Sequence, residues 1–191
     1  MQRVFAILII AIGAACGRPE PPPPAPAATT PAGADAKARP AAAPALVPPV
    51  PPDVLGALLP EIAGWTRESP RVELISEPVA YSKAEAHYRR GDERIELVIT
   101  DSGFQPVVLA PIQLFLAAGS EEHTGDAVRK TVTIAGAPGT ESWTASAGRG
   151  EVTALVAGRF IVTAEARFVA DLGAARAVVR AVDFHRLAGL R

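Results

Sequence analysis

Two neighbouring stretches of the chain alternate between apolar and polar residues with a period of two. Residues 83–89 place Ala or Tyr at every second position between charged or histidine residues, and residues 94–99 place Ile or Leu at every second position between Arg94, Glu96 and Val98. Because successive side chains of a strand point to opposite faces, each stretch predicts a strand with one buried face. The turn residues 90–93 lie between them, so we expect an antiparallel hairpin.

Two segments near the ends of the folded part have the boundary residues of helices. The first begins at Asp53, a residue suited to cap a helix, is interrupted near Pro60 and ends by Trp65. The last follows Asp171, another candidate cap, and repeats apolar residues at helical spacing from Leu172 to Val182. We therefore expect one short helix at the start of the domain and one helix at its end.

Residues 106–118 form the most apolar segment of the domain, with Gln113 as the one polar residue. Pro111 lies near the expected helix start and Gly119 lies just past its end, which is the usual asymmetry of helix boundaries. A helix that is apolar all round is normally buried on most sides. We therefore expect a core helix here, with the wall of an apolar pocket (Val107–Leu116) as the alternative.

Four further strands are expected between the second and third helices, because strand-like alternation continues there and glycine-rich turns separate the runs. The runs cover residues 128–134, 140–146, 152–157 and 160–166. Hairpin-length connections force mostly antiparallel pairing. The sequence therefore predicts an α+β fold, with a mostly antiparallel sheet of about six strands, helices on one or both faces, and the order α-β-β-α-β-β-β-β-α.

The first sixteen residues have the three parts of a secretory signal: a positive charge at Arg3, a short apolar run, and small residues before a cleavage point. The run Val4–Ala15 covers 12 residues. That corresponds to about 18 Å of helix, too short to cross a hydrocarbon core of about 30 Å. The small residues end at Cys16, the single cysteine of the chain.

This segment resembles a bacterial lipoprotein signal, in which Ala14 and Ala15 precede a cysteine that is acylated and becomes the new N-terminus. The resemblance implies lipidation at Cys16, and a multiply acylated cysteine anchors a protein stably without a membrane-spanning helix. Gly17 follows the cysteine, and the absence of Asp there implies the outer membrane, facing the periplasm, over the inner membrane. A plain signal peptide, or an uncleaved anchor with an incidental cysteine, is the alternative.

Residues 16–52 hold 13 of the 19 prolines and many alanines. Such a segment can neither continue a helix nor supply the donors of a sheet, so we expect a disordered tether, with a ligand for a proline-recognising domain as the alternative. The predicted organisation is a signal peptide at 1–15, the lipidated cysteine and tether at 16–52, and a single globular domain at 53–191.

Charge and cysteine content narrow the function classes. Lys and Arg number 19 against 20 for Asp and Glu, so there is no basic excess for nucleic-acid binding. One cysteine cannot form an intramolecular disulfide or a multi-cysteine zinc site. The predicted partners are a membrane, through the lipid on Cys16, and a protein of the cell envelope.

No recognised catalytic motif occurs, and no cofactor is expected. A hydrolase using Asp101, Ser102 or His123 is one hypothesis, although Asp–Ser is more often turn chemistry. The cluster Glu121–Asp126 has oxygen and imidazole ligands but lacks the calcium-loop pattern, so we predict a solvated loop and no metal.

Aromatic and apolar residues remain as candidates for a binding surface, because they supply large contact areas. They are Trp143, Trp65, Leu114 and Phe115. The leading hypothesis is a lipid-anchored envelope protein that presents a non-enzymatic binding or assembly domain. A periplasmic carrier of an apolar ligand and a hydrolase are the alternatives.

Overall fold

A computed structural model of the chain describes residues 45–119 and 121–190. The predictions that fall on residues 1–44, including the signal peptide, lipidation of Cys16 and most of the tether, lie outside the described residues. The helices are α1 (Pro52–Gly56), α2 (Pro106–Ala118), α3 (Gly173–Ala181) and α4 (Phe184–Ala188). The strands are β1 (Thr66–Arg67), β2 (Arg71–Ile75), β3 (Tyr81–Arg90), β4 (Glu93–Asp101), β5 (Glu121–Thr124), β6 (Ala127–Ile134), β7 (Ala137–Thr144), β8 (Arg149–Val156) and β9 (Phe160–Arg167).

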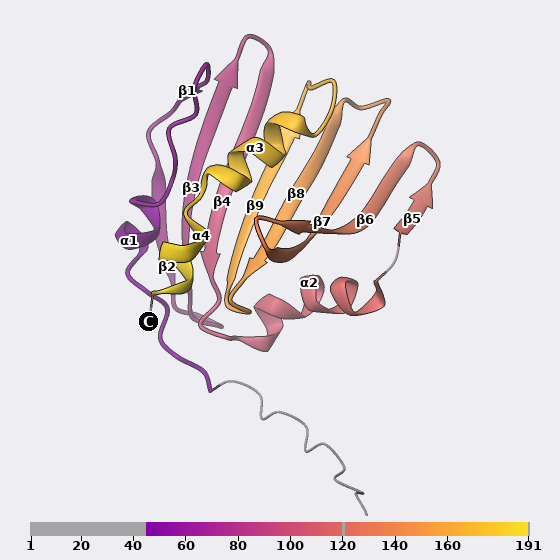
Figure 1. The fold of residues 1–191 in the computed structure, drawn as a ribbon. Helices are drawn as coiled ribbons and strands as arrows, with labels where there is room; N and C mark the ends of the chain where they lie inside the picture. Colours follow the sequence, from indigo (N-terminus) through magenta and orange to yellow (C-terminus); the bar gives the residue numbers. More distant parts are fainter. Residues whose placement is uncertain (1–44, 120, 191) are drawn as a thin grey trace, which may run out of the picture. The chain divides into compact units, whose positions relative to one another are not determined.

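All the strands join one antiparallel sheet in the order β1-β3-β4-β9-β8-β7-β6-β5, and β2 also pairs with β3 (Figure 1). The predicted α+β class and antiparallel pairing are therefore confirmed. The expected count of about six strands and the expected element order are wrong, since the described residues form nine strands and four helices. The three additional strands, β1, β2 and β5, are short and almost wholly exposed, so their side chains show no alternation of burial.

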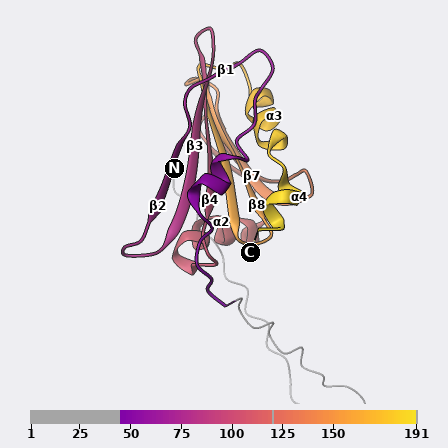
Figure 2. The same cartoon turned by 90° about the vertical axis from the view of Figure 1, so that its left-hand side faces the viewer.

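The predicted hairpin is present as β3 and β4, in which buried and partly exposed residues alternate. Its buried positions continue across β9 and β8, where Val162 and Val152 occupy the same face of the sheet. Helices α3 and α4 pack on this face and close the main core (Figures 1 and 2). The core therefore lies between the middle strands, the two C-terminal helices and the segment around α1, which contributes Leu55, Leu58 and Leu59.

The folded part begins before Asp53. Val50 is buried in the main core, and its backbone N–H donates a hydrogen bond of 2.7 Å to Asp101 Oδ2. Helix α1 starts at Pro52 and is shorter than expected, ending at Gly56. The chain therefore already contacts the domain at the end of the Pro/Ala-rich segment.

Helix α2 has the predicted bounds, and Gly119 ends it in the left-handed conformation (φ 58°). It packs on the face opposite to α3, where Leu109 and Ile112 contact Leu155. The expectation that it is buried on most sides is wrong, because Leu114 is 76% exposed. The reason is its position: α2 lies across one end of the sheet, and within the described residues it buries one side only (Figure 1).

The expected single C-terminal helix is two helices. Val182 is extended (ψ 130°), and Asp183 then caps α4 by accepting a hydrogen bond of 2.9 Å from the backbone N–H of Arg186. At the start of α3, the Asp171 carboxylate accepts a bond of 2.6 Å from the N–H of Gly173. Val182 remains buried, so the apolar spacing continues across the break and conceals it in the sequence.

Candidate functional site

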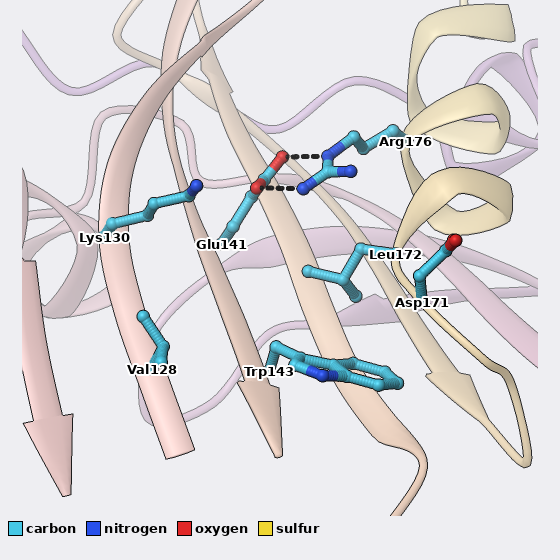
Figure 3. Close-up of a pocket in the computed structure, with 7 residues that line it drawn as sticks. All are labelled: Val128, Lys130, Glu141, Trp143, Asp171, Leu172 and Arg176. Atoms are coloured by element: carbon cyan, nitrogen blue, oxygen red, sulfur yellow. Dashed lines mark hydrogen bonds and ion pairs between the residues drawn. The ribbon is translucent and has the colours of Figure 1, made fainter. Parts of the chain in front are cut away.

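The face of the sheet that carries α3 also has an open part. Beside the N-terminal half of α3, side chains of β6 and β7 border a hollow of about 220 Å³ (Figure 3). We call it the Trp143 hollow. Its lining residues are Val128, Lys130, Glu141, Trp143, Asp171, Leu172 and Arg176.

The apolar floor of the Trp143 hollow is formed by Trp143 and Leu172, which lie over a glycine of the neighbouring strand. Trp143 pairs across the sheet with Gly150 of β8. A Cβ atom on Gly150 would collide with the backbone carbonyl oxygen of Ser142, and it would also lie 2.8 Å from Cδ2 of Leu172 and 3.0 Å from Cε3 of Trp143. The missing side chain therefore lets the indole and the leucine lie close together over the strand. Trp143 is half-buried, so part of its surface is open to a ligand.

One wall of the hollow is an ion pair between Arg176 and Glu141 that has two hydrogen bonds. Arg176 Nε and Nη2 donate to the two carboxylate oxygens of Glu141 at 2.6 and 2.7 Å. These hydrogen bonds hold the pKa of Glu141 below its usual range although burial raises it, and they raise the pKa of Arg176. Glu141 is only 5% exposed, so the guanidinium provides the partner that a buried carboxylate needs.

Lys130 adds a second cation. It pairs with Glu141 across β6 and β7, and its amine points toward the same carboxylate (Figure 3). Two cations, Lys130 and Arg176, thus face one carboxylate beside the apolar floor. Asp171 at the edge of the hollow balances the second cation, so the lining has no net charge, and Lys130 is the local point that would attract a negative group of a ligand placed on Trp143.

The four residues predicted for a binding surface do not form one surface. Trp143 lies in the hollow, whereas Trp65 precedes β1 and packs against the core, with the Arg90 guanidinium 4.5 Å from its ring centroid. Leu114 and Phe115 belong to α2, on the other face of the sheet. Phe115 is buried and Leu114 points outward.

Asp101 and Ser102, predicted for a hydrolase, are occupied by structural contacts. The carboxylate of Asp101 is buried against Arg159, and the hydroxyl of Ser102 donates to the carbonyl of Arg159 at 2.6 Å. His123 lies on the exposed edge strand β5, where its ring pairs with Glu121 at 2.9 Å. In the described residues no hydrogen bond joins His123 to Asp101 or Ser102, so this acid, hydroxyl and imidazole are not assembled.

The segment Glu121–Asp126 is a strand and a turn. Asp126 accepts a hydrogen bond of 2.7 Å from the N–H of Ser146. Hydrogen bonding with the side chain and then the backbone of Ser146 lowers the pKa of its carboxyl group. Across residues 45–119 and 121–190, no three His, Cys, Asp or Glu side chains gather as a metal ion would require.

The inner side of α2 borders a second, more polar hollow. Its lining combines Arg129, Glu151 and several threonines with the apolar side chains of Pro111 and Ile112. Arg129 also lies 3.8 Å from the ring centroid of Phe115. The helix therefore packs on a charged strip of the sheet, and the space beside it is not a closed apolar pocket.

Sequence reasoning identified Trp143 but missed the charged residues beside it. Glu141 and Trp143 share one parity of the strand, a signal that both face the same side. Arg176 lies among the polar residues between the apolar positions of its predicted helix, and its partner is 35 residues away in the chain. The pairing depends on how α3 packs on the sheet, which the sequence pattern does not specify.

No protein-family model matches the chain, and no curated protein or solved structure matches it either. None of the helices within the described residues has both the length and the apolar character that a membrane span requires.

Proposed function

We propose that this chain is a lipid-anchored bacterial envelope protein that presents a non-enzymatic binding domain on a tether. The support for the anchor is the sequence Ala14-Ala15-Cys16 after a short apolar run. Gly17 favours the outer membrane, with the domain in the periplasm. The Pro/Ala-rich segment then separates the domain from the membrane by a variable distance.

The observation that carries the binding role is the Trp143 hollow. A half-buried tryptophan next to a paired arginine is the composition typical of binding hot spots. Lys130 supplies a positive charge at the rim, and Val128 and Leu172 extend the apolar floor. We infer that the hollow receives an apolar side chain of a partner protein, with a carboxylate of that partner near Lys130.

The non-enzymatic assignment rests on how the acid and hydroxyl groups are used. Asp101 and Ser102 are held by Arg159, and Glu141 is held by Arg176. A general base or nucleophile needs a free polar atom within reach of the substrate. We infer that these side chains instead stabilise the fold that presents the binding surface.

The anchor is tested by mass analysis of the mature chain. The expected N-terminus is Cys16 carrying fatty acyl chains, and Cys16→Ala should abolish both the processing and the membrane fraction. A free thiol at Cys16, or an intact Met1, would contradict the anchor.

The binding surface is tested by photocrosslinking in intact cells. A crosslinking residue at Val128, on the rim, should capture an envelope protein, whereas the same residue at the exposed Glu151 on the opposite face should not. Trp143→Ala should remove the crosslink while circular dichroism shows a folded domain. Equal capture from both positions would contradict this surface.

A further inference from the structure

Helix α2 exposes a stripe of apolar side chains along its outer side. Leu114 is the most exposed large apolar side chain of the described residues, at 76%, and Val107 is 64% exposed. The helix contains no charged residue. We call the exposed apolar residues on the outer side of the helix the outer stripe; they are Val107, Ala110, Leu114, Ala117 and Ala118.

The chain enters the domain beside the start of this helix. The N–H of Val47 donates a hydrogen bond of 3.1 Å to the carbonyl of Gly103, three residues before α2 begins at Pro106. Gly103 has φ +55°, and a Cβ atom there would collide with the carbonyl oxygen of Val47. The first described residues of the chain are thereby held at the end of the sheet where α2 lies (Figures 1 and 2).

We propose that the outer stripe of α2 docks on the surface of the lipid bilayer that holds the acylated Cys16. This inference rests on the proposed lipid anchor. Twenty-eight residues, 17–44, separate Cys16 from the described part of the chain. At about 3.5 Å per residue they reach at most about 100 Å, so an acylated Cys16 limits the distance between the bilayer and the domain to this length.

The lipid anchor allows a small apolar stripe to dock on the membrane. A few exposed apolar side chains hold a free protein on a membrane only weakly, since membrane binding scales with buried apolar area. A tether converts docking into an intramolecular event with a high effective concentration. Weak docking therefore becomes populated for an anchored domain.

The shape of the stripe favours lipid over a protein partner. The outer stripe is a convex ridge without charges or hydrogen-bonding groups apart from the neighbouring Gln113. A protein partner would need a matching groove and gains specificity from polar contacts at the rim. A fluid lipid interface accommodates a convex apolar ridge without such a match.

The experiment uses the full-length processed protein in phosphatidylcholine vesicles. With Cys16 acylated, Leu114→Cys supplies a single free thiol for an environment-sensitive dye, and Ala177→Cys on the exposed side of α3 is the matched control. We expect blue-shifted emission at position 114 and strong quenching by lipids with a spin label in the upper acyl chain. We expect neither at position 177.

A charged residue placed in the outer stripe should weaken the docking of the domain on the vesicles. Val107→Asp should lower the fraction of docked domain measured by the dye at position 114 about tenfold, because the contact of a branched apolar side chain is lost. Ala177→Asp should leave it unchanged.

Flotation of the vesicles separates the two proposals. Protein that floats with the vesicles but shows no quenching at position 114, or equal quenching at 114 and 177, overturns the docking and leaves the anchor intact. Protein that does not float overturns both. A crosslinker at position 114 that captures an envelope protein in cells, with no lipid quenching, assigns the stripe to a protein partner and also overturns the docking.

Discussion

Asp101 and Arg159, 58 residues apart in the chain, form a buried ion pair with two parallel hydrogen bonds of 2.7 Å. Asp101 also accepts hydrogen bonds from the N–H groups of Val50 and Gly103. Arg159 in turn donates to the carbonyls of Pro48 and Leu190 at 3.4 Å. One ion pair thus joins both ends of the described chain to the end of β4 and to the turn between β8 and β9.

Removing the carboxylate of this pair should strongly destabilise the domain. Asp101→Ala leaves the Arg159 charge buried without its partner, and the loss of one partner of a buried pair costs about 3–5 kcal/mol. The measurement is the free energy of unfolding from urea denaturation followed by circular dichroism. Glu165→Gln, which removes an exposed pair with Arg167, is the control and should change it far less. Equal losses in the two variants would contradict the structural role of Asp101.

Glu141 should make the free energy of unfolding decrease at acidic pH. Its pKa in the folded state lies below the unfolded value of 4.5 because Arg176 donates hydrogen bonds to the carboxylate. A lowered pKa stabilises the fold above pH 4.5, and this contribution disappears as the pH falls through the folded pKa. We expect Glu141→Gln to be less stable than the natural chain at pH 7 and the difference to shrink in acid. Urea denaturation across this pH range measures it, and a constant difference would contradict the prediction.

Tyr88 should make the free energy of unfolding decrease at alkaline pH. Burial raises the pKa of its phenol from 10.0 to about 12, and the hydroxyl donates a hydrogen bond of 2.8 Å to the carbonyl of Pro60. A raised phenol pKa means that the neutral form stabilises the fold below pH 10, and that this contribution is lost as the pH rises toward 12. Ultraviolet titration should show one late tyrosine, absent in Tyr88→Phe. At pH 7 that variant should lose about 1 kcal/mol of stability with the hydrogen bond. A normal titration of both tyrosines would contradict it.

Gly150 should be required for the floor of the Trp143 hollow. Gly150→Ala places a methyl group against the backbone carbonyl oxygen of Ser142 as well as against Trp143 and Leu172, so the strand itself must shift, and the overpacking should cost about 1–3 kcal/mol or more. The emission of Trp143, recorded in a Trp65→Phe background, should shift as the indole moves. Gly189→Ala is the control, because its Cβ would be no closer than 3.4 Å to any neighbour. Unchanged emission in Gly150→Ala would contradict the described packing.

The elements that could be predicted are those in which the pattern of apolar and polar side chains follows the pattern of burial. β3 and β4 each place one face in the core, so alternation is visible in the residues themselves. The end of α2 follows from Gly119, whereas Pro111, expected near the helix start, lies inside the helix. β1, β2 and β5 are held mainly by backbone pairing at the edges of the sheet, and their exposed side chains carry no comparable signal.

The candidate site could be predicted only in part, for a related physical reason. Trp143 was identified because a large aromatic residue is informative wherever it lies. Glu141 is buried only because Arg176 reaches it from α3, and Arg159 is buried only because Asp101 faces it. Each of these pairs joins distant parts of the chain, and a local pattern cannot show which charged residue has such a partner.

The attachment of Val47 and Val50 to the end of β4 determines where mechanical force enters the domain. A pull applied through the N-terminal segment reaches β4, which lies inside the sheet between β3 and β9, and not an edge strand. Peeling one edge strand after another is therefore not the first event under tension. The domain should resist stretching until the contacts of Asp101 break together, whereas a pull from the β5 side would open the sheet strand by strand.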